Sequence, residues 1–442
     1  MTKNWKTSRY TSYLREESGT VILHNSFMGA IAKVPAGKIP ALDRYLIRGI
    51  DDTDYGHPLV KELCDGGFFV ESDINEQEAV EDVLRQEQEN RFGLMLLVHE
   101  GCNFRCQYCY EKHVLGRMSP DVVKGLKTLV ARQAEVYRGV SANWFGGEPL
   151  LAQDIIQELS RSFMDDCRQH NIPYSSSITT NGFLLKPEVV GELLDCQVKH
   201  FQVTLDGPQP YHDVRRPLRN GQGTYRQIMG NLAQMKQRSE DFTVRLRINF
   251  DQPLVPEIER WLEDEISPLL GNDPRFHLMF FAVQRWGGDN DDTVDVCEFD
   301  IADSAISQFD SRSLATGFSD TTIKEVLKPH GLVCYASRES MIIVGADGTI
   351  YKCSVHFSDP RNRVGKLTAG GELQLDPELW RLWVNQEDID KSDCANCRIF
   401  PICQGNRCPY TALNDKKPLC AMSKEKFENA IRLIASNGHR GE

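Results

Sequence analysis

The stretch EGCNFRCQYCYEKH, residues 100–113, places three cysteines close together, with an aromatic residue, Tyr108, directly before the last of them. The cysteines form the pattern C-x3-C-x2-C and are Cys102, Cys106 and Cys109. Three thiolates are one short of a closed tetrahedral site, so a four-iron cluster held here would keep one iron open to another ligand. The alternative is a zinc ion whose fourth ligand is His99 or His113.

Outward from this stretch, apolar runs alternate with amphipathic segments from about residue 92 to about residue 285. We predict strands at GLMLLVHE (93–100), SANWFGGEP (141–149), SSSITTNG (175–182), HFQVTLDG (200–207), TVRLRINFD (243–251) and HLMFFAVQ (277–284). Repeated βα units predict a parallel sheet buried on both faces, either open or closed into a barrel. Chemistry in such sheets gathers at the carboxyl ends of the strands, where the cysteines and the motifs below fall.

The N-terminal part, about residues 9–73, predicts a small α+β unit. Three short strands, RYTSYLRE, TVILHNS and GAIAKVP, precede two helical patterns, IPALDRYLIRG and HPLVKELC. The acidic stretch at residues 75–90 then predicts a solvated linker helix.

The chain has 14 cysteines and no apparent secretion signal, and the reducing cytosol leaves metal binding or catalysis as the usual roles of such residues. Seven of them follow the predicted sheet, which is enough for two sites: Cys334, Cys353, Cys394, Cys397, Cys403, Cys408 and Cys420. Structural zinc is the alternative for this region, because C-x2-C pairs are common zinc ligands. Cys64, Cys167 and Cys196 lie in helix-like apolar patterns and are interpreted as packed side chains.

A formal net charge of -12 argues against a protein that binds nucleic acid, because phosphate binding needs a basic surface. The N-terminus is polar, and no apolar run is long enough to span a membrane. We therefore expect a cytoplasmic protein with neither a nucleic-acid nor a membrane partner.

The cysteine stretch and its aromatic residue resemble the signature of the radical S-adenosylmethionine (radical SAM) family. The resemblance implies an α/β fold with a partial (β/α)6 TIM barrel, in which the open iron of a [4Fe-4S] cluster binds SAM and electron transfer yields a 5′-deoxyadenosyl radical. The cofactor contacts that it implies are Tyr108, the segment Gly146, Gly147, Glu148 and Pro149, and then Thr204, Asp206 and Asn249. For Asp206, a turn position before Gly207 is an equal alternative.

By order and spacing, the seven later cysteines resemble the SPASM extension of radical SAM enzymes, which carries two auxiliary [4Fe-4S] clusters. Three clusters are then implied in all. One auxiliary cluster would be held by Cys394, Cys397, Cys403 and Cys420, and the inner one by Cys334, Cys353 and Cys408. Cys403 and Cys408 are separated by one residue more than is usual in the family. The inner site has a fourth ligand, either Cys297 or another group, or else it is open to substrate.

By its pattern, the N-terminal part resembles the PqqD-like recognition element, a winged-helix-like module that binds the leader of a ribosomally made precursor peptide. A packing cap on the barrel is the alternative. Together the resemblances predict three domains: a recognition module with its linker helix at 1–90, the barrel at 91–310 and the SPASM domain at 311–442.

These resemblances imply a peptide-modifying enzyme that abstracts hydrogen from a precursor peptide to install a crosslink or another C–H modification. Flavodoxin or ferredoxin would donate the electron. In sulfatase-maturing relatives an aspartate base follows the second SPASM cysteine, whereas Ser354 follows Cys353 here, which disfavours formylglycine formation. Oxidation of an alcohol or thiol and a zinc-bearing peptide-binding scaffold are the alternatives. No catalytic base is assigned, because the sequence alone does not identify either His212 or His356 as the residue that accepts the proton.

Overall fold

The structure is a computed structural model that describes residues 4–437 except 287, 289, 386–388, 395 and 421. Contacts between residues divide the chain into two compact units, each assembled from separate segments. The first comprises Met1–Glu87, Asp320–Ser337 and Gln386–Glu442, and the second Gln88–Ser319 and Arg338–Asn385. The division at residues 90 and 310 into three domains stays a prediction.

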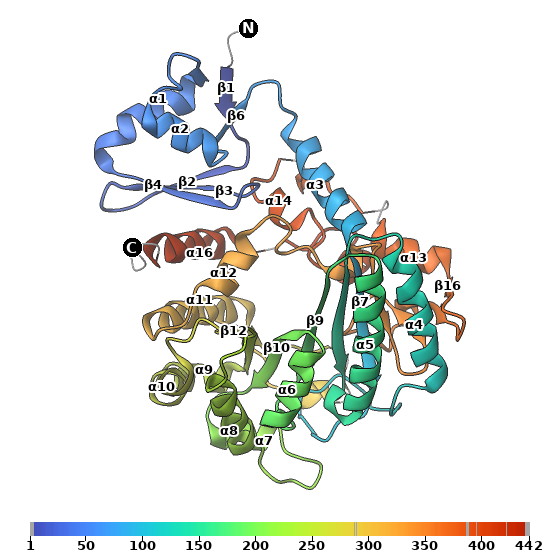
Figure 1. Ribbon diagram of the computed structural model, residues 1–442. Helices are drawn as coiled ribbons and strands as arrows, with labels where there is room; N and C mark the ends of the chain where they lie inside the picture. Colours follow the sequence, from blue (N-terminus) through green and yellow to red (C-terminus); the bar gives the residue numbers. More distant parts are fainter. Residues whose placement is uncertain are drawn as a thin grey trace. The chain divides into compact units, whose positions relative to one another are not determined.

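The second unit contains a ten-stranded sheet whose order is β12-β11-β10-β9-β8-β7-β13-β14-β15-β16 (Figure 1). Its first six strands are parallel, and each lies beside its neighbour in the sequence. They are β7 (Phe92–His99), β8 (Val140–Gly146), β9 (Tyr174–Thr180), β10 (Val198–Leu205), β11 (Thr243–Phe250) and β12 (Phe276–Ala282). This arrangement confirms the predicted α/β partial barrel.

Helices connect these strands and cover the outer side of the sheet (Figure 1). Their bounds are α4 (Pro120–Ala134), α5 (Gln153–Gln169), α6 (Pro187–Asp195), α7 (Gln209–Arg215), α8 (Tyr225–Lys236), α9 (Val255–Trp261), α10 (Ser267–Leu270) and α11 (Phe299–Ala315). The start of α4 is set by its N-cap, because the side chain of Ser119 accepts a hydrogen bond from the backbone N–H of Val122 and Pro120 opens the first turn.

Four strands from the cysteine-rich part of the sequence extend this sheet. The strand β13 (Met341–Val344) is parallel to β7, and β14 (Thr349–Tyr351), β15 (Arg363–Leu367) and β16 (Leu373–Leu375) follow as an antiparallel meander. Helix α13 (Pro377–Val384) follows β16. Cys353 and Ser354 come directly after β14 and so belong to the same unit as the barrel.

In the first unit, β2 (Thr11–Arg15), β3 (Val21–Asn25) and β4 (Ala30–Val34) form an antiparallel sheet. A second small sheet places β1 (Asn4–Thr7) between β5 (Ile50–Asp51) and β6 (Phe69–Glu71). The helices of this module are α1 (Ile39–Arg48), α2 (Pro58–Asp65) and α3 (Glu76–Asn90). They confirm the predicted small α+β module, whereas its PqqD-like character stays a prediction.

The remaining helices of the first unit are α12 (Thr321–Leu327), α14 (Phe400–Cys403), α15 (Pro409–Asp415) and α16 (Lys424–Asn437). Helix α16 packs against β3, β4 and α12. The sequence predicted no contact between the N-terminal module and the end of the chain. In the part of the chain that the structure describes, no helix combines the length and the apolar character needed to cross a bilayer.

Candidate active site

A cavity of about 440 Å³ lies inside the partial barrel and is reached by side chains from successive strands. Because side chains alternate between the two faces of a strand, residues two apart on β8, β10 and β11 point into it. The strand residues that line it are Met95, Asn143, Phe145, Gly146, Thr179, Thr180, Gln202, Thr204, Arg247, Asn249 and Phe281. The volume falls in the range typical of sites for small molecules.

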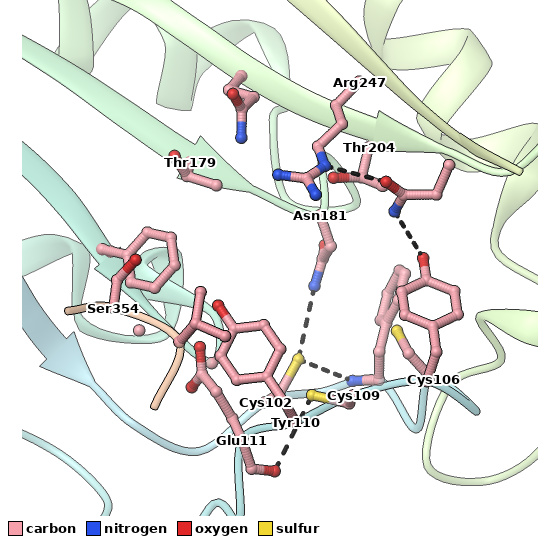
Figure 2. Close-up of a pocket in the computed structure, with 18 of the residues that line it drawn as sticks. Cys102, Cys106, Cys109, Tyr110, Glu111, Thr179, Asn181, Thr204, Arg247 and Ser354 are labelled. Atoms are coloured by element: carbon pink, nitrogen blue, oxygen red, sulfur yellow. Dashed lines mark hydrogen bonds between the residues drawn. The ribbon is translucent and has the colours of Figure 1, made fainter. Parts of the chain in front are cut away.

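The three cysteines of the 100–113 stretch all line this cavity, which places them together as the pattern predicted (Figure 2). Burial raises the pKa of Cys102 to about 12, and it also raises the pKa of Cys106 and of Cys109. Buried thiols deprotonate at neutral pH only when a nearby positive charge compensates, and bound iron supplies that charge. The donor set therefore fits a metal cluster.

The zinc alternative has less support from the geometry. Within the described residues, no three His, Cys, Asp or Glu side chains are grouped so as to hold one metal ion. A [4Fe-4S] cluster binds each cysteine through a different iron, so it does not need the ligands to converge on one point. Two histidines were predicted as possible fourth ligands of a zinc ion. His113 places Nε2 3.5 Å from Cys109 Sγ, whereas His99 Nδ1 lies 3.0 Å from the carbonyl oxygen of Gly101.

Two glycines at the end of β8 let the backbone turn pass directly beside the cysteine loop. Gly146 has φ of +120°, a conformation that side chains rarely tolerate. The N–H of Gly147 donates to the carbonyl oxygen of His99 at 3.0 Å, and the N–H of Glu148 donates to that of Gly101 at 3.0 Å. Both glycines line the cavity, as the cofactor prediction required, and their contact with a cofactor stays a prediction.

We expect Gly147→Ala to destabilise the second unit by about 2 kcal/mol, since the new Cβ has no room. It would lie 2.6 Å from the carbonyl oxygen of Gly101 and 2.7 Å from that of Glu100, and a backbone atom cannot move aside alone. The shift would also displace the cysteine loop and reduce the iron retained after reconstitution. Gly230→Ala in α8 is the control, because it meets nothing within 4 Å and should stabilise the helix. Equal urea unfolding midpoints for the two variants would contradict the prediction.

Glu148 and Pro149 do not line the cavity. The carboxylate of Glu148 is fully buried, and its Oε1 accepts hydrogen bonds from the backbone N–H of Leu150 at 3.0 Å and from Thr180 Oγ1 at 2.7 Å. Its Oε2 accepts from the backbone N–H of Asn181 at 2.8 Å. In this structure Glu148 therefore ties the turn after β8 to the end of β9, and its predicted contact with the cofactor stays a prediction.

A buried polar network on one wall joins three residues of the cofactor prediction. The hydroxyl of Tyr108 donates to Asp206 Oδ1 at 2.9 Å and accepts from Asn249 Nδ2 at 3.0 Å. Asp206 is fully buried and lies behind the cavity rather than on its surface, whereas Tyr108 and Asn249 line it. Thr204 lines it as well.

Arg216, which the sequence reasoning missed, completes this network. Its Nη1 donates to the Tyr108 hydroxyl at 2.9 Å and lies 3.9 Å from Asp206 Oδ1, and the two side chains are 6% and 0% exposed. Burial opposes its charge, but the nearby Tyr108, Cys106 and Asp206 outweigh that cost and raise the pKa of Arg216. The wall beside the cysteines thus carries the Arg216 guanidinium in its charged form.

Other lining residues were also missed. Arg247 lies over the ring of Phe281, 4.0 Å from its centroid, and its Nε donates to Asn249 Oδ1 at 2.9 Å. Asn181 approaches the Cys102 thiol, with Nδ2 3.9 Å from Sγ (Figure 2). Glu111 is the one described lining residue with a carboxylate, and burial, followed by the charge of Glu100, raises its pKa to about 8.

Four of the later cysteines lie near one another in the first unit. Burial, with the charges of Cys397, Cys394 and Cys420 acting in the same direction, raises the pKa of Cys403 to about 11. Burial likewise raises the pKa of Cys394, with Cys397 and Cys420 acting in the same direction. These are the four residues predicted to hold one auxiliary cluster.

The three cysteines predicted for the inner cluster are distributed over both units. Cys334 and Cys408 belong to the first unit and Cys353 to the second. The backbone N–H of Cys334 donates to the carbonyl oxygen of Asn406 at 2.9 Å, which links Cys334 to the loop before Cys408. Their shared ligation stays a prediction, as does the role of Cys297.

The cysteines interpreted as packed side chains do not line the barrel cavity. Cys167 and Cys196 are 1% and 3% exposed, and Cys64 packs against the core of the N-terminal module. Burial raises the pKa of all three. Nothing in their surroundings points to chemistry.

Comparison with known families and structures agrees with this site. The family described as "Radical SAM superfamily" matches residues 96–249, which include the cysteine stretch and β7–β11. The radical SAM cyclopropyl synthase TigE of Paramaledivibacter caminithermalis is 20% identical over 90% of this chain and 88% of its own length. The serine-type anaerobic sulfatase-maturating enzyme of Klebsiella aerogenes is 21% identical over 72% of this chain and 79% of its own length.

Among solved structures, anSMEcpe with bound AdoMet and Cp18Cys peptide aligns with a TM-score of 0.57 at 18% identity, covering 79% of this chain and 99% of that one. At this identity the likeness confirms the fold. Fold and site together define an iron–sulfur enzyme built on a partial βα barrel. Residues 96–249 thus form a radical SAM domain, a class that uses SAM and a [4Fe-4S] cluster.

Proposed function

We propose that this enzyme modifies a ribosomally made precursor peptide at a C–H bond, forming a crosslink or a related modification. The observation that carries the proposal is the meeting of Cys102, Cys106 and Cys109 with polar side chains of four strands, β8 to β11, around one cavity. The cluster and SAM, when bound, supply the removal of a hydrogen atom. The chain itself supplies binding, orientation and exclusion of water.

The wall residues suit the polar groups of SAM. The Arg216 guanidinium would pair with the methionyl carboxylate, since a planar fork of N–H donors matches a carboxylate. The Gly146–Gly147 backbone would admit the methionyl part closely. Thr204 and Asn249 would hydrogen-bond the adenosyl part.

A peptide substrate is supported by two comparisons. TigE is named as a cyclopropyl synthase of the radical SAM class, and anSMEcpe was solved with a peptide bound beside AdoMet. In this chain the cavity lining also includes Phe281, Trp286 and Val355, so an uncharged side chain would be accommodated beside them. The edge strand β4 of the N-terminal module would pair with the leader of the precursor.

Oxidation of a Ser or Cys to formylglycine, the reaction suggested by the sulfatase-maturating relative, is the second candidate. Ser354 disfavours formylglycine formation, because it would replace an aspartate that acts as the base. The structure places Ser354 and Val355 on the cavity, so this position does face the reaction space (Figure 2). A serine there cannot take a proton as a carboxylate would.

The two auxiliary clusters also belong to the proposal. Cys394, Cys397, Cys403 and Cys420 would hold one, as the influence of Cys397 and Cys420 on the pKa of Cys394 and of Cys403 supports. Cys334, Cys353 and Cys408 would hold the other. A flavodoxin or ferredoxin would supply electrons, and the enzyme would work in the cytoplasm, where thiols stay reduced.

The test is anaerobic reconstitution with iron and sulfide, followed by reaction with SAM, dithionite and the short peptides encoded next to the gene. We expect about twelve irons per chain from three clusters, and 5′-deoxyadenosine whose yield rises with one of these peptides. Mass spectrometry should show that peptide lacking two hydrogens.

The alternatives give different results. A peptide whose Ser or Cys becomes an aldehyde would establish formylglycine formation. Zinc in place of iron, with no 5′-deoxyadenosine, would leave only a peptide-binding scaffold and overturn the proposal.

A further inference from the structure

The cysteine loop is paired along its outer edge with a second segment that is rich in arginine. The backbone N–H of Arg105 donates to the carbonyl oxygen of Pro217 and that of Gln107 to Arg215, both at 2.9 Å. In the reverse sense, the N–H of Arg219 donates to the carbonyl oxygen of Asn103 at 3.0 Å. A β-bridge between Phe104 and Leu218 completes this antiparallel pairing.

Side chains of the loop alternate as in a strand. Phe104 is buried and Cys106 lines the cavity, whereas Arg105 and Gln107 are exposed. The outer face of the loop therefore presents the neighbours of Cys106 directly to solvent. Only the backbone of the loop would separate a protein docked on this face from the Cys106 side chain.

This face is basic in an acidic protein. Residues 103–117 and 214–226 contain seven Lys or Arg and one Glu, a local formal charge of +6 in a chain of net charge -12. Some of these cations are used internally: Arg216 is buried, Arg215 pairs with Asp251, and Arg117 pairs with Asp154.

The charges of Arg105 and Arg219 are not neutralised in this way. Both are exposed, and neither forms an ion pair with any residue that the structure describes. Two unneutralised guanidinium groups thus flank the cysteine loop on its outer side.

A partly apolar depression adjoins these charges. A second cavity, of about 580 Å³, is lined by Gln107 and by apolar residues that include Val214, Pro253 and Val294, and also by Asp251, which pairs with Arg215, and by Asp295. Val214 is 64% exposed at its edge. An apolar centre beside a charged rim is the usual composition of a protein–protein interface.

We propose that the outer face of the cysteine loop, defined by Arg105, Gln107, Val214 and Arg219, is the docking surface for a small acidic one-electron donor protein of the flavodoxin type. The inference rests on the proposed function, because it presumes a cluster on the three cysteines. In the transfer, the reduced flavin loses one electron to become a semiquinone, and the cluster gains that electron. Opposite charges on the two proteins would speed encounter and orient the flavin toward the loop.

The precursor peptide is the other conceivable occupant, but the geometry favours the donor. A substrate must bring its C–H bond into the barrel cavity, onto which Cys102 and Cys106 open. The residues of the docking surface point to the opposite side of the loop. An electron, unlike a hydrogen atom, can cross the intervening backbone without contact between the reacting groups.

The test compares the reconstituted double variant Arg105→Glu/Arg219→Glu with a control of equal charge change, Lys124→Glu/Arg132→Glu on the exposed side of α4. A purified bacterial flavodoxin is the probe, and calorimetry measures its affinity at low and high salt. We expect the double variant to bind about tenfold more weakly at low salt than the wild type or the control, with a smaller difference at high salt. Flavodoxin-driven formation of 5′-deoxyadenosine should fall in parallel, whereas dithionite-driven formation should not change.

Arg219→Glu alone is the safer variant, since the Arg105 guanidinium also donates to the carbonyl oxygen of Phe104. It should weaken flavodoxin binding about threefold. Unchanged flavodoxin affinity in both variants would overturn the proposal, and so would a selective loss of precursor-peptide affinity, which would assign the surface to the substrate. If the wild type forms no 5′-deoxyadenosine with dithionite, the proposed function fails, but the flavodoxin affinities still decide whether this surface binds the donor.

Discussion

The Cys106→Ala variant is expected to form no 5′-deoxyadenosine and to retain about four irons fewer per chain than the wild type. Cys106 is the middle ligand of the C-x3-C-x2-C stretch, and its side chain lines the cavity together with those of Cys102 and Cys109 (Figure 2). Two thiolates cannot keep a [4Fe-4S] cluster that must also leave one iron open. Loss of this cluster removes the site at which SAM binds, so the effect should be complete rather than partial.

Cys167→Ala is the control for this experiment. Cys167 is more buried than the three cluster cysteines, at 1% exposed, but it lies on α5 and does not line the barrel cavity. Its removal should leave the iron content and the yield of 5′-deoxyadenosine close to those of the wild type. Iron analysis and chromatography of the nucleoside products measure both quantities. Equal iron in the two variants would contradict the assignment of Cys106.

The second large effect is expected at Arg216. Replacing it with glutamine leaves the buried Asp206 carboxylate without its counter-charge and removes a donor to Tyr108. Removing one partner of a buried pair is strongly destabilising, and we expect a loss of about 3 kcal/mol in the second unit. We also expect SAM to bind more weakly, since the guanidinium is one of the two arginine side chains that line the cavity, the other being Arg247.

The stability effect and the binding effect of Arg216 can be separated. In Arg216→Gln/Asp206→Asn, the unpaired carboxylate is gone, so thermal stability should return toward that of the wild type while SAM affinity stays low. Arg216→Lys keeps the charge without the planar fork and should retain more stability than affinity. If Arg216→Gln is as stable as the wild type, the buried pair contributes nothing. If the double variant loses the sum of the single losses, the two residues are not coupled.

Much of the barrel could be read from the sequence. The runs predicted as strands at residues 93–100 and 200–207 correspond to β7 (Phe92–His99) and β10 (Val198–Leu205), and the helix predicted from PEVVGELLD is α6 (Pro187–Asp195). Period-two and period-3.6 patterns are local, so they survive without knowledge of the fold. The strand β13 (Met341–Val344) was not predicted to join this sheet, because strand pairing across more than two hundred residues leaves no local signal.

The residues of the site can likewise be divided into those that the sequence revealed and those that it did not. The three cysteines and the Gly146–Gly147 turn were found because their spacing is itself the signal. Arg216 and Arg247 were missed, since a single arginine after a helix or within a strand is usually a surface residue. Their burial follows from the tertiary structure, which brings them from separate elements to the same wall as Tyr108 and Asn249.

The sequence by itself determined the chemistry that this protein can perform: three thiolates at fixed spacing, a glycine turn after the next strand, and strands whose carboxyl ends meet. Those features depend on residues close together in the chain. Only the tertiary structure decided which side chains complete the site, since Asp206 and Glu148 lie behind the cavity surface while Arg216, Glu111 and Ser354 line it. The physical reason is that burial and charge pairing are properties of neighbours in space, and most neighbours of the cysteine loop come from distant parts of the chain.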